Sequence, residues 1–474
     1  MTSPQDTHRW FSRCASIGAF MVPGLALWLP SGYSYGAVLL LLVTLASAPL
    51  WWRRPAPRAA WWLTAAFSCM AALWMLDVGA TWGWGSMDRP VKYLLALPCI
   101  FFLMTFEPRA AWLWMGVAVG AVGSGLVALY QTFVMELPRA NGFTNAIQYG
   151  NLSMLLAVMS GLLLVVQWKR WCLWQRLLLA SAIGLGAAGS VLSQSRGGWL
   201  ALVLLLPVCA WLLVRTTGQR RVYWGLCALA LAAAALSQVP AVEQRVDEAR
   251  QEVQVYKDHG DGRSSVGQRL AHWRLAWQMG WDRPFTGWGR AGYTDEKARR
   301  VAAGLAHPVV LEFGHAHNEI LDLFAKRGLP GVLLLMAFYG IPLAMFWPTA
   351  RRIRDGAGKM DKESLSLCLV GVMVPLSYIG FGLTQVFLAH NSGNMFYLFM
   401  CPLVLAALHE RRTRMGCPRP LLMKHPLSRF APSPSLAARE GVATRGLAKP
   451  VPRWHWLGPR QFHGLRVSRS AMEN

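Results

Sequence analysis

The stretch HAHNEILDLFAKRGLPGVLLLMAFYGIPLAMFW, residues 315–347, joins an island of ionisable side chains to a long apolar run. The apolar part, 329–347, is long enough to cross the hydrocarbon core of a membrane as a helix. An ionisable group at such a border is costly to hold unless it is paired or carries out a function. The stretch therefore predicts a membrane-spanning helix with a candidate functional site at its start.

Local signals within this stretch predict a short helix ahead of the span. Asn318 is a good N-cap, Glu319 places a negative charge in the first turn, and basic side chains occupy the last turn. Gly328 is expected to stop the helix, with Pro330 just beyond. His317 then lies immediately before the helix N-terminus, where unpaired backbone N–H groups favour anions.

The rest of the chain has the composition of a membrane protein. Of its 474 residues, 54% are hydrophobic and 15% are charged, and 24 are tryptophan. Repeated apolar runs of roughly 17 to 25 residues are each candidates for transmembrane helices. We predict an all-α polytopic membrane protein with about twelve transmembrane helices, at 14–30, 34–52, 60–77, 91–106, 110–135, 147–167, 172–192, 197–214, 221–239, 329–347, 364–389 and 392–409.

The distribution of Lys and Arg predicts the orientation of these helices. One set of connections, around 53–58, 169–176, 215–221 and 351–362, carries most of the basic residues, so this set and both termini are expected to be cytoplasmic. No cleavable signal peptide is expected, because the first apolar run leads directly into a second. The predicted organisation is a cytoplasmic N-terminus (1–13), transmembrane helices 1–9 (14–239), a long far-side loop (240–328), transmembrane helices 10–12 (329–409) and a basic cytoplasmic tail (410–474).

The formal net charge of +24 does not indicate nucleic-acid binding. Most of the excess lies in the predicted cytoplasmic loops and tail, which favours a topological role and contact with anionic membrane lipids. The nine cysteines all fall in predicted spans or in the tail, so we expect no disulfide framework in the far-side loop.

The far-side loop is too long for a plain connector, and its patterns predict two amphipathic helices, at 242–256 and 266–279. Between the second of these and the histidines, Gly287-Trp-Gly289-Arg-Ala-Gly292 has the spacing of a dinucleotide-binding motif. No strand precedes it and no βαβ unit surrounds it, so we interpret it as a glycine-rich turn that packs close to the membrane.

Three arginines on the far side are candidate ligands for an anion, and the two in short connections, Arg139 and Arg196, run against the topological bias. They are Arg139, Arg196 in Ser193-Gln-Ser-Arg-Gly-Gly198, and Arg269 in the loop. Arginines of this kind would bind a diphosphate bidentately, and a neutral His317 would act as a general base. The alternatives are that the arginines extend to lipid headgroups and that His315 and His317 are structural. Two histidines without a third ligand do not predict a zinc site, and we expect no metal or cofactor.

These motifs resemble those of a known family. His317-Asn318, nine residues, and then Gly328-Leu-Pro-Gly331 is similar to the signature of bacterial lipopolysaccharide O-antigen ligases. Ser193–Gly198 resembles the Ser-x-Arg-Gly element of the wider O-antigen ligase/polymerase family, and Gln268-Arg269 through Trp273, followed by 284–289, resembles the element ahead of the histidine. The resemblance covers most of residues 10–410.

The resemblance implies a GT-C-like membrane glycosyltransferase of the bacterial inner membrane with its active site facing the periplasm. The donor would be O-antigen polysaccharide on undecaprenyl diphosphate, and the acceptor a sugar hydroxyl of lipid A–core. The arginines matching Arg196 and Arg269 would engage the diphosphate, with Arg139 as our additional candidate, and His317 would be the catalytic residue of an inverting, metal-independent transfer. His315, Asn318, Gly328 and Gly331 would support the site.

Three alternatives remain open at this point. The first is an O-antigen polymerase of the same broad family, and the second is a related oligosaccharyltransferase, for which we see no extra periplasmic domain. The third, from a different class, is a lipid or solute transporter. A transporter would place ionisable residues near the middle of the membrane and show repeated halves, whereas the ionisable groups here gather at one face.

Overall fold

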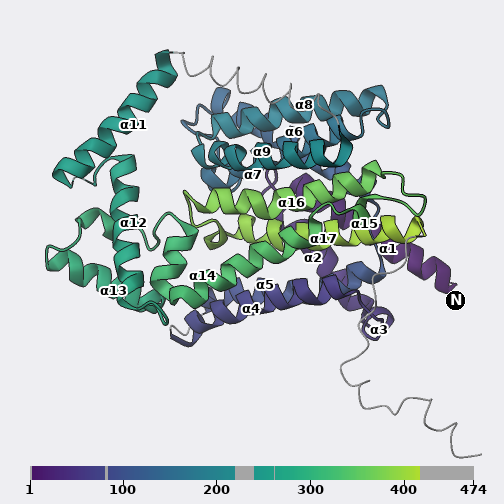
Figure 1. The fold of residues 1–474 in the computed structure, drawn as a ribbon, viewed down its shortest axis with the longest axis horizontal. Coiled ribbons are helices and arrows are strands. Elements are labelled where there is room, and N and C mark those ends of the chain that lie inside the picture. Colours follow the sequence, from purple (N-terminus) through teal and green to yellow (C-terminus); the bar gives the residue numbers. More distant parts are fainter. Residues whose placement is uncertain (1–2, 81–83, 219–239, 261, 417–474) are drawn as a thin grey trace, which may run out of the picture. The chain divides into compact units, whose positions relative to one another are not determined.

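The computed structural model describes residues 3–80, 84–218, 240–260 and 262–416, and within them the chain consists of helices and loops with no strand (Figure 1). The helices before the far-side loop are α1 (Pro4–Leu25), α2 (Gly32–Ala46), α3 (Ala48–Trp51), α4 (Arg58–Ala80), α5 (Trp84–Thr105), α6 (Ala110–Phe133), α7 (Ala146–Val166), α8 (Leu173–Leu192) and α9 (Arg196–Thr217). After them come α11 (Pro240–His259), α12 (Ser265–Asp282), α13 (Gly289–Ala302), η1 (Pro308–Leu311), α14 (Glu319–Phe346), α15 (Ala350–Ile353), α16 (Lys362–Gly382), η2 (Phe387–Ala389) and α17 (Asn391–Arg414).

Within the described residues, eight helices are long and apolar enough to cross a membrane: α4, α6, α7, α8, α9, α14, α16 and α17. The all-helical, polytopic membrane fold is thus confirmed, and eight of the twelve predicted spans meet this criterion in the part of the chain that the structure describes. The predicted spans 14–30, 34–52 and 91–106 correspond to α1, to α2 with α3, and to α5. The predicted span 221–239 and most of the predicted tail lie outside the described residues.

The three predicted spans that fall short do so for physical reasons. Helix α2 has 15 residues and ends at Ser47, whose hydroxyl donates to the carbonyl of Val43, so the apolar run 34–52 is divided. Helix α5 carries Asp88, Arg89 and Lys92 in its first half, and α1 begins in a polar segment at Pro4. An apolar run in the sequence thus does not specify where its helix ends, because backbone breaks and charged turns divide it.

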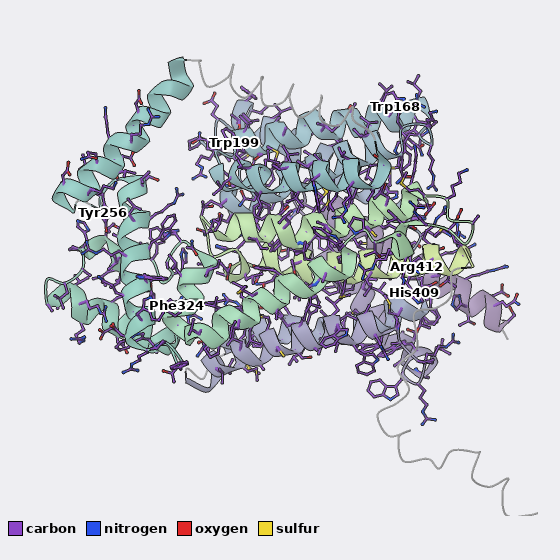
Figure 2. The ribbon with its side chains drawn as sticks, in the orientation of Figure 1. Trp168, Trp199, Tyr256, Phe324, His409 and Arg412 are labelled. Atoms are coloured by element: carbon purple, nitrogen blue, oxygen red, sulfur yellow. The ribbon has the colours of Figure 1, made fainter. Side chains whose placement is uncertain are left out.

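Helices α16 and α17 form the centre of the bundle. Each is almost wholly buried, and α16 packs against α7, α9, α14 and α17 (Figure 1). Helix α8, in contrast, is only 28% buried. Among the outer helices, exposed Trp168 and Trp199 lie at opposite ends (Figure 2), where tryptophan suits the two boundaries between lipid and water.

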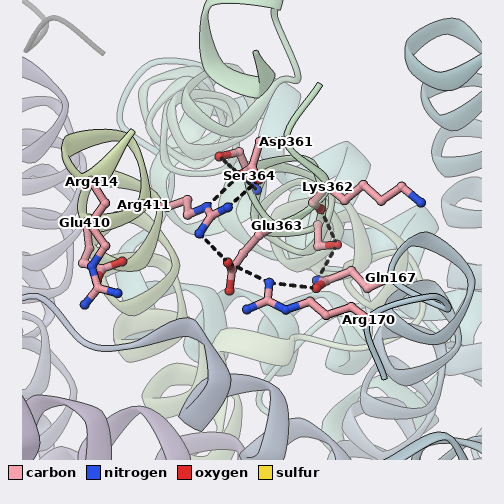
Figure 3. A network of polar contacts seen from close by, with 10 residues as sticks. Gln167, Arg170, Asp361, Lys362, Glu363, Ser364, Glu410, Arg411 and Arg414 are labelled. Atoms are coloured by element: carbon pink, nitrogen blue, oxygen red, sulfur yellow. Dashed lines mark hydrogen bonds and ion pairs between the residues drawn. The ribbon is translucent and has the colours of Figure 1, made fainter. Parts of the chain in front are cut away.

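The N-terminal end of α16 carries a network of ion pairs, which we call the α16 ion-pair network (Figure 3). Arg411 of α17 donates from Nε and Nη2 to the two carboxylate oxygens of Asp361, at 2.9 and 2.6 Å. Glu363 lies 2.7 Å from Arg170 and 3.1 Å from Arg411. The network joins the loop after α7 to the start of α16 and the end of α17.

The far-side loop folds into three helices with a small core of their own. The predicted helices at 242–256 and 266–279 are confirmed as α11 and α12, whereas α13 was not predicted. The core of the far-side loop includes Ala271, Leu275, Met279 and Tyr293. Helix α12 also packs against α14. The glycine-rich motif does form a turn, with φ of 62° at Gly287 and 66° at Gly289, but a helix follows from Gly289 onward.

Two glycines allow the loop to pack directly on the start of α14. Gly328 has φ 64° and ψ −163°, so it breaks the helical hydrogen bonding as predicted, although α14 resumes immediately and runs on to Phe346. A Cβ on Gly328 would lie 2.4 Å from the carbonyl oxygen of Pro284, and one on Gly287 would lie 2.3 Å from the backbone nitrogen of Arg327. The two motifs therefore require glycine because their backbones touch.

Candidate functional site

The site is centred on the loop that leads into α14. Asn318 is the N-cap: its side-chain oxygen accepts from the backbone N–H groups of Ile320 and Leu321, at 3.0 and 3.1 Å. Its amide nitrogen donates to the carbonyl of Leu383 at 3.2 Å, which ties the loop to the end of α16. The predicted capping role of Asn318 is confirmed, and it places His317 beside the 383–390 segment.

His317 has a strained backbone conformation. Its φ is 52°, in the left-handed region that a bulky residue rarely adopts. Gln194, in the Ser193–Gly198 motif, has the same feature, with φ 54°. Conformations of this kind cost about 1–3 kcal/mol and concentrate at sites where geometry serves a function.

The imidazole of His317 is held from one side and unpaired on the other. Its Nδ1 lies 3.1 Å from Oε1 of Gln385, which is buried at 3% exposure. Because an amide oxygen only accepts, this arrangement assigns the ring hydrogen to Nδ1 and a lone pair to Nε2. Nε2 is buried, and no other described residue forms a hydrogen bond with it.

Two further histidines pack against His317, and we call the three the histidine cluster (His272, His315 and His317). The ring centroid of His315 is 4.4 Å from that of His317, and its Nδ1 accepts from the His317 backbone N–H at 3.4 Å. His272, on α12, has its ring 5.4 Å from His317. The structure therefore gives His315 a place in the site, and it adds His272, which the sequence analysis did not select.

Burial keeps the histidine cluster neutral. It lowers the pKa of His272 to about 3 and that of His315 to about 4, and nearby imidazoles add to both shifts. Burial also lowers the pKa of His317, the hydrogen bond to Gln385 partly opposes this, and the positive charge of Arg269 lowers it further. A neutral His317 at pH 7 has the protonation state that a general base needs.

Buried charges beneath the histidine cluster hold its loop in place. Asp322 accepts from the backbone N–H of Ala316 at 2.9 Å, and Lys326 donates to Asp322 and to the carbonyl of Gly314. Lys297, on α13, is 1% exposed and donates to the carbonyls of Val310 and Phe313, at 2.8 and 2.5 Å. The far-side helix that the sequence did not predict thus supports the segment before His315.

Glu319 has a different environment from the one expected of a first-turn acid. It is 1% exposed, and one carboxylate oxygen accepts from the backbone N–H of Leu388 at 2.9 Å. This bond anchors the 383–390 segment, which carries Gln385. Gln385 has no distinguishing signal in the sequence beyond its polarity at the end of a predicted span, 364–389.

A polar cavity of about 200 Å³ lies close to the histidine cluster, and we call it the arginine cavity. Arg139 and Arg269 both line it, and Gly197 adds the first turn of α9. The other lining residues are Ile147, Gln194, Ser195, Ser265 and Thr384. Two guanidinium groups, several hydroxyl or amide groups and a helix N-terminus form a setting suited to a phosphate-type anion.

The predicted site residues come from distant parts of the chain, and the fold brings several of them together. Arg139 also donates from Nε to the carbonyl of Ser193 at 3.0 Å, which fixes it to the Ser193–Gly198 motif. Arg196 is the first residue of α9, beside Ser195 of the arginine cavity; its side chain lies outside the described atoms. Gly331 lies one turn after the bend in α14, where a Cβ would meet Cβ of Arg327 at 2.4 Å. Among the residues that the structure describes, no group of three His, Cys, Asp or Glu side chains could hold a metal ion.

Two comparisons with known proteins bear on the family of this chain. Residues 181–336 match the family model described as O-antigen ligase, a segment that contains Arg196, Arg269 and His317. An uncharacterized protein of Haemophilus influenzae is 26% identical over 313 residues, which are 66% of this chain and 77% of that protein. The family match confirms the resemblance that the motifs predicted.

Proposed function

We propose that this chain, which matches the O-antigen ligase family over 181–336, transfers O-antigen polysaccharide from undecaprenyl diphosphate to a sugar hydroxyl of lipid A–core. The family match carries the coarser conclusion, an enzyme of bacterial glycan assembly in a multi-pass membrane protein. The specific transfer reaction is supported by one observation: Arg139 and Arg269 line the same cavity, and Arg269 is near enough to His317 to lower its pKa.

The arginine cavity is the proposed site of the donor diphosphate. Arg139 and Arg269 are permanently charged and can bind phosphate oxygens through two parallel N–H groups. The backbone N–H groups at the start of α9, next to Ser195 and Gly197, add partial positive charge. As the bond from the sugar to the diphosphate breaks, these groups stabilise the negative charge that develops on the leaving group.

His317 is the proposed general base. The acceptor hydroxyl oxygen attacks the anomeric carbon of the donor, the bond from that carbon to the diphosphate oxygen breaks, and the hydroxyl proton passes to Nε2 of His317. Undecaprenyl diphosphate leaves with the bonding electron pair, and the anomeric centre inverts. Gln385 fixes the tautomer from the Nδ1 side, and the strained backbone of His317 fixes the direction of the ring.

We further propose that the site faces the periplasm of the bacterial inner membrane, with both termini in the cytoplasm and 240–328 as the periplasmic loop. The polar groups of the site gather at one end of the helices rather than at their middle, which supports an enzyme over a transporter. A polymerase of the same broad family remains the second candidate, since the family match covers both activities.

The test is a lipopolysaccharide gel of a strain that lacks this chain, complemented with variants. We expect wild type to restore O-antigen on the core, and His317→Ala to lower transfer about 10²–10⁴-fold, the usual contribution of a general base. Arg269→Ala should fail as well, while Arg274→Ala, an exposed arginine on the same helix, should behave as wild type.

Three outcomes separate the candidates. Bare core in the empty strain supports a ligase, core with a single repeat unit indicates a polymerase, and normal capped lipopolysaccharide with His317→Ala excludes His317 as the base. Immunoblots of each variant in the membrane fraction control for expression.

A further inference from the structure

His272 is a buried imidazole that the proposed chemistry leaves unused. Its side chain is 0% exposed, and neither ring nitrogen has a hydrogen-bond partner among the described residues. It lies on α12 one turn after Arg269, which lines the arginine cavity. Leaving a buried polar group unpaired costs about 1–3 kcal/mol, and folded proteins retain few such groups. An unpaired imidazole beside a candidate base is therefore available to hydrogen-bond a ligand.

His272 and His317 are neighbouring rings that carry complementary hydrogen-bonding groups. Their ring centroids are 5.4 Å apart and their planes are inclined by 79°, and the unpaired nitrogens of both are buried. With Nδ1–H of His317 donating to Gln385, its Nε2 offers a lone pair. A neutral His272 has one N–H and one lone pair, so the pair together offers an acceptor and a donor.

The neutral state of His272 follows from its surroundings. Burial lowers its pKa to about 3, so the ring does not carry a charge at neutral pH. The ionisable groups near it and near His317 are His315, Lys297, Asp322 and Arg269. Two of these are cations, which also disfavour a proton on either ring.

A hydroxyl group is the ligand that matches this pair. It donates one hydrogen, which suits the lone pair of His317, and it accepts, which suits the N–H of His272. A carboxylate or an ionised phosphate diester has no hydrogen to give to Nε2, and an ammonium group has no lone pair to accept from His272. The chemistry of the pair thus selects an alcohol over an ion.

Phe313 covers the two imidazoles from the exposed side. Its ring centroid lies 4.6 Å from His317 and 6.2 Å from His272, and the side chain is 38% exposed. It stands between exposed Glu312 and Gly314, and a Cβ on Gly314 would meet open space. The ring of Phe313 lies outside the buried core of the far-side helices.

We propose that His272 and His317 together bind the hydroxyl of the acceptor sugar, beneath Phe313. The hydroxyl donates to Nε2 of His317 and accepts from the ring N–H of His272. In the transfer step the proton passes to His317 while the N–H of His272 keeps its hydrogen and holds the attacking oxygen. This inference rests on the proposed transfer reaction and adds the acceptor site to it.

The first test measures steady-state kinetics of the purified full chain with undecaprenyl diphosphate-linked O-antigen and purified lipid A–core. His272→Phe keeps the ring volume but removes both nitrogens, and we expect it to raise the KM for lipid A–core at least about tenfold, as for a site that loses its hydrogen bond to a hydroxyl. The KM for the donor should stay unchanged. His272→Asn, which keeps an N–H, should recover most of the loss.

A matched control is His307→Phe, the same exchange at a half-buried histidine outside the histidine cluster. It should leave both KM values at wild-type levels. An unchanged acceptor KM in His272→Phe overturns the acceptor site, and so does an equal loss in His272→Phe and His272→Asn, because a purely structural role predicts no rescue. Thermal melting of each purified variant identifies any that does not fold.

The second test does not depend on turnover. In protein labelled with ¹⁵N-histidine, lipid A–core added without donor should shift the resonances of both His272 and His317, assigned from the two single variants. Resonances of His272 that do not move overturn the acceptor site. Absence of transfer by wild type, in contrast, contradicts the proposed function, so the two failures are distinguishable.

Discussion

The two ends of α16 differ in whether their buried polar groups have partners within the chain. At its N-terminal end, the carboxylates of Asp361 and Glu363 meet Arg411 and Arg170 in the α16 ion-pair network. At its C-terminal end, Gln385 binds one nitrogen of His317, while the other nitrogen and both nitrogens of His272 remain unpaired among the described residues. The first end pairs these two carboxylates within the chain, and the second leaves imidazole nitrogens with hydrogen-bonding capacity for a ligand.

The difference separates a structural role from a binding role. Buried polar groups that pair within the chain fix how helices meet, whereas unpaired ones lower stability and need a reason to persist. His317 and Gln194, which both have a strained positive φ, lie at the end with the unpaired groups, near the arginine cavity. Changes at the paired end should therefore affect stability, and changes at the unpaired end should affect transfer.

The largest effect on stability is expected from Arg411→Met. It leaves Asp361 and Glu363 without their shared partner in a half-buried setting, and we expect the free energy of unfolding to fall by about 3 kcal/mol. Thermal melting of the purified protein measures the change, and transfer per folded molecule should stay near wild type. Arg351→Met, at an exposed arginine in the short helix α15, should alter neither. Loss of transfer without loss of stability would abolish the distinction between the two ends.

An intermediate effect is expected from mild acid at the histidine end. The folded chain keeps His272 neutral down to about pH 3, whereas the unfolded chain binds a proton there below about pH 6.5. Stability is therefore retained above pH 6.5 and falls as the pH drops toward 3, by about 1.4 kcal/mol per pH unit for this residue. Melting curves of wild type and His272→Phe between pH 7 and 5.5 measure it. The variant should lose part of the acid sensitivity, and identical curves would show that His272 does not contribute.

The smallest effect is expected from Gln385→Leu. The substitution removes the hydrogen bond to Nδ1 of His317, which is worth about 1 kcal/mol, so kcat should fall about fivefold with little change in melting temperature. Gln385→Glu retains an acceptor for Nδ1–H and should lose less, because a carboxylate also stabilises the protonated ring. Equal kcat values for wild type and Gln385→Leu would show that the ring is held by its packing alone.

Local patterns were enough to find much of the site. Asn318 caps α14, Gly328 breaks it, and α11 and α12 lie where the apolar periodicity placed them. These features depend on neighbours within a few residues, so the sequence carries them directly. Three of the twelve predicted spans do not have the length and hydropathy of a membrane span, because the length of an apolar run reveals neither the break at Ser47 nor the effect of the charges in α5.

By itself, the sequence determined a polytopic helical membrane protein whose motifs resemble those of the O-antigen ligase family, with an ionisable cluster at the start of a span. Only the tertiary structure decided which groups meet. Gln385 reaches His317 from 68 residues away, His272 enters from α12, and Arg139 joins Arg269 in one cavity. The reason is that helix formation and capping are local, whereas the partner of a buried polar side chain is chosen by how helices distant in the sequence pack together.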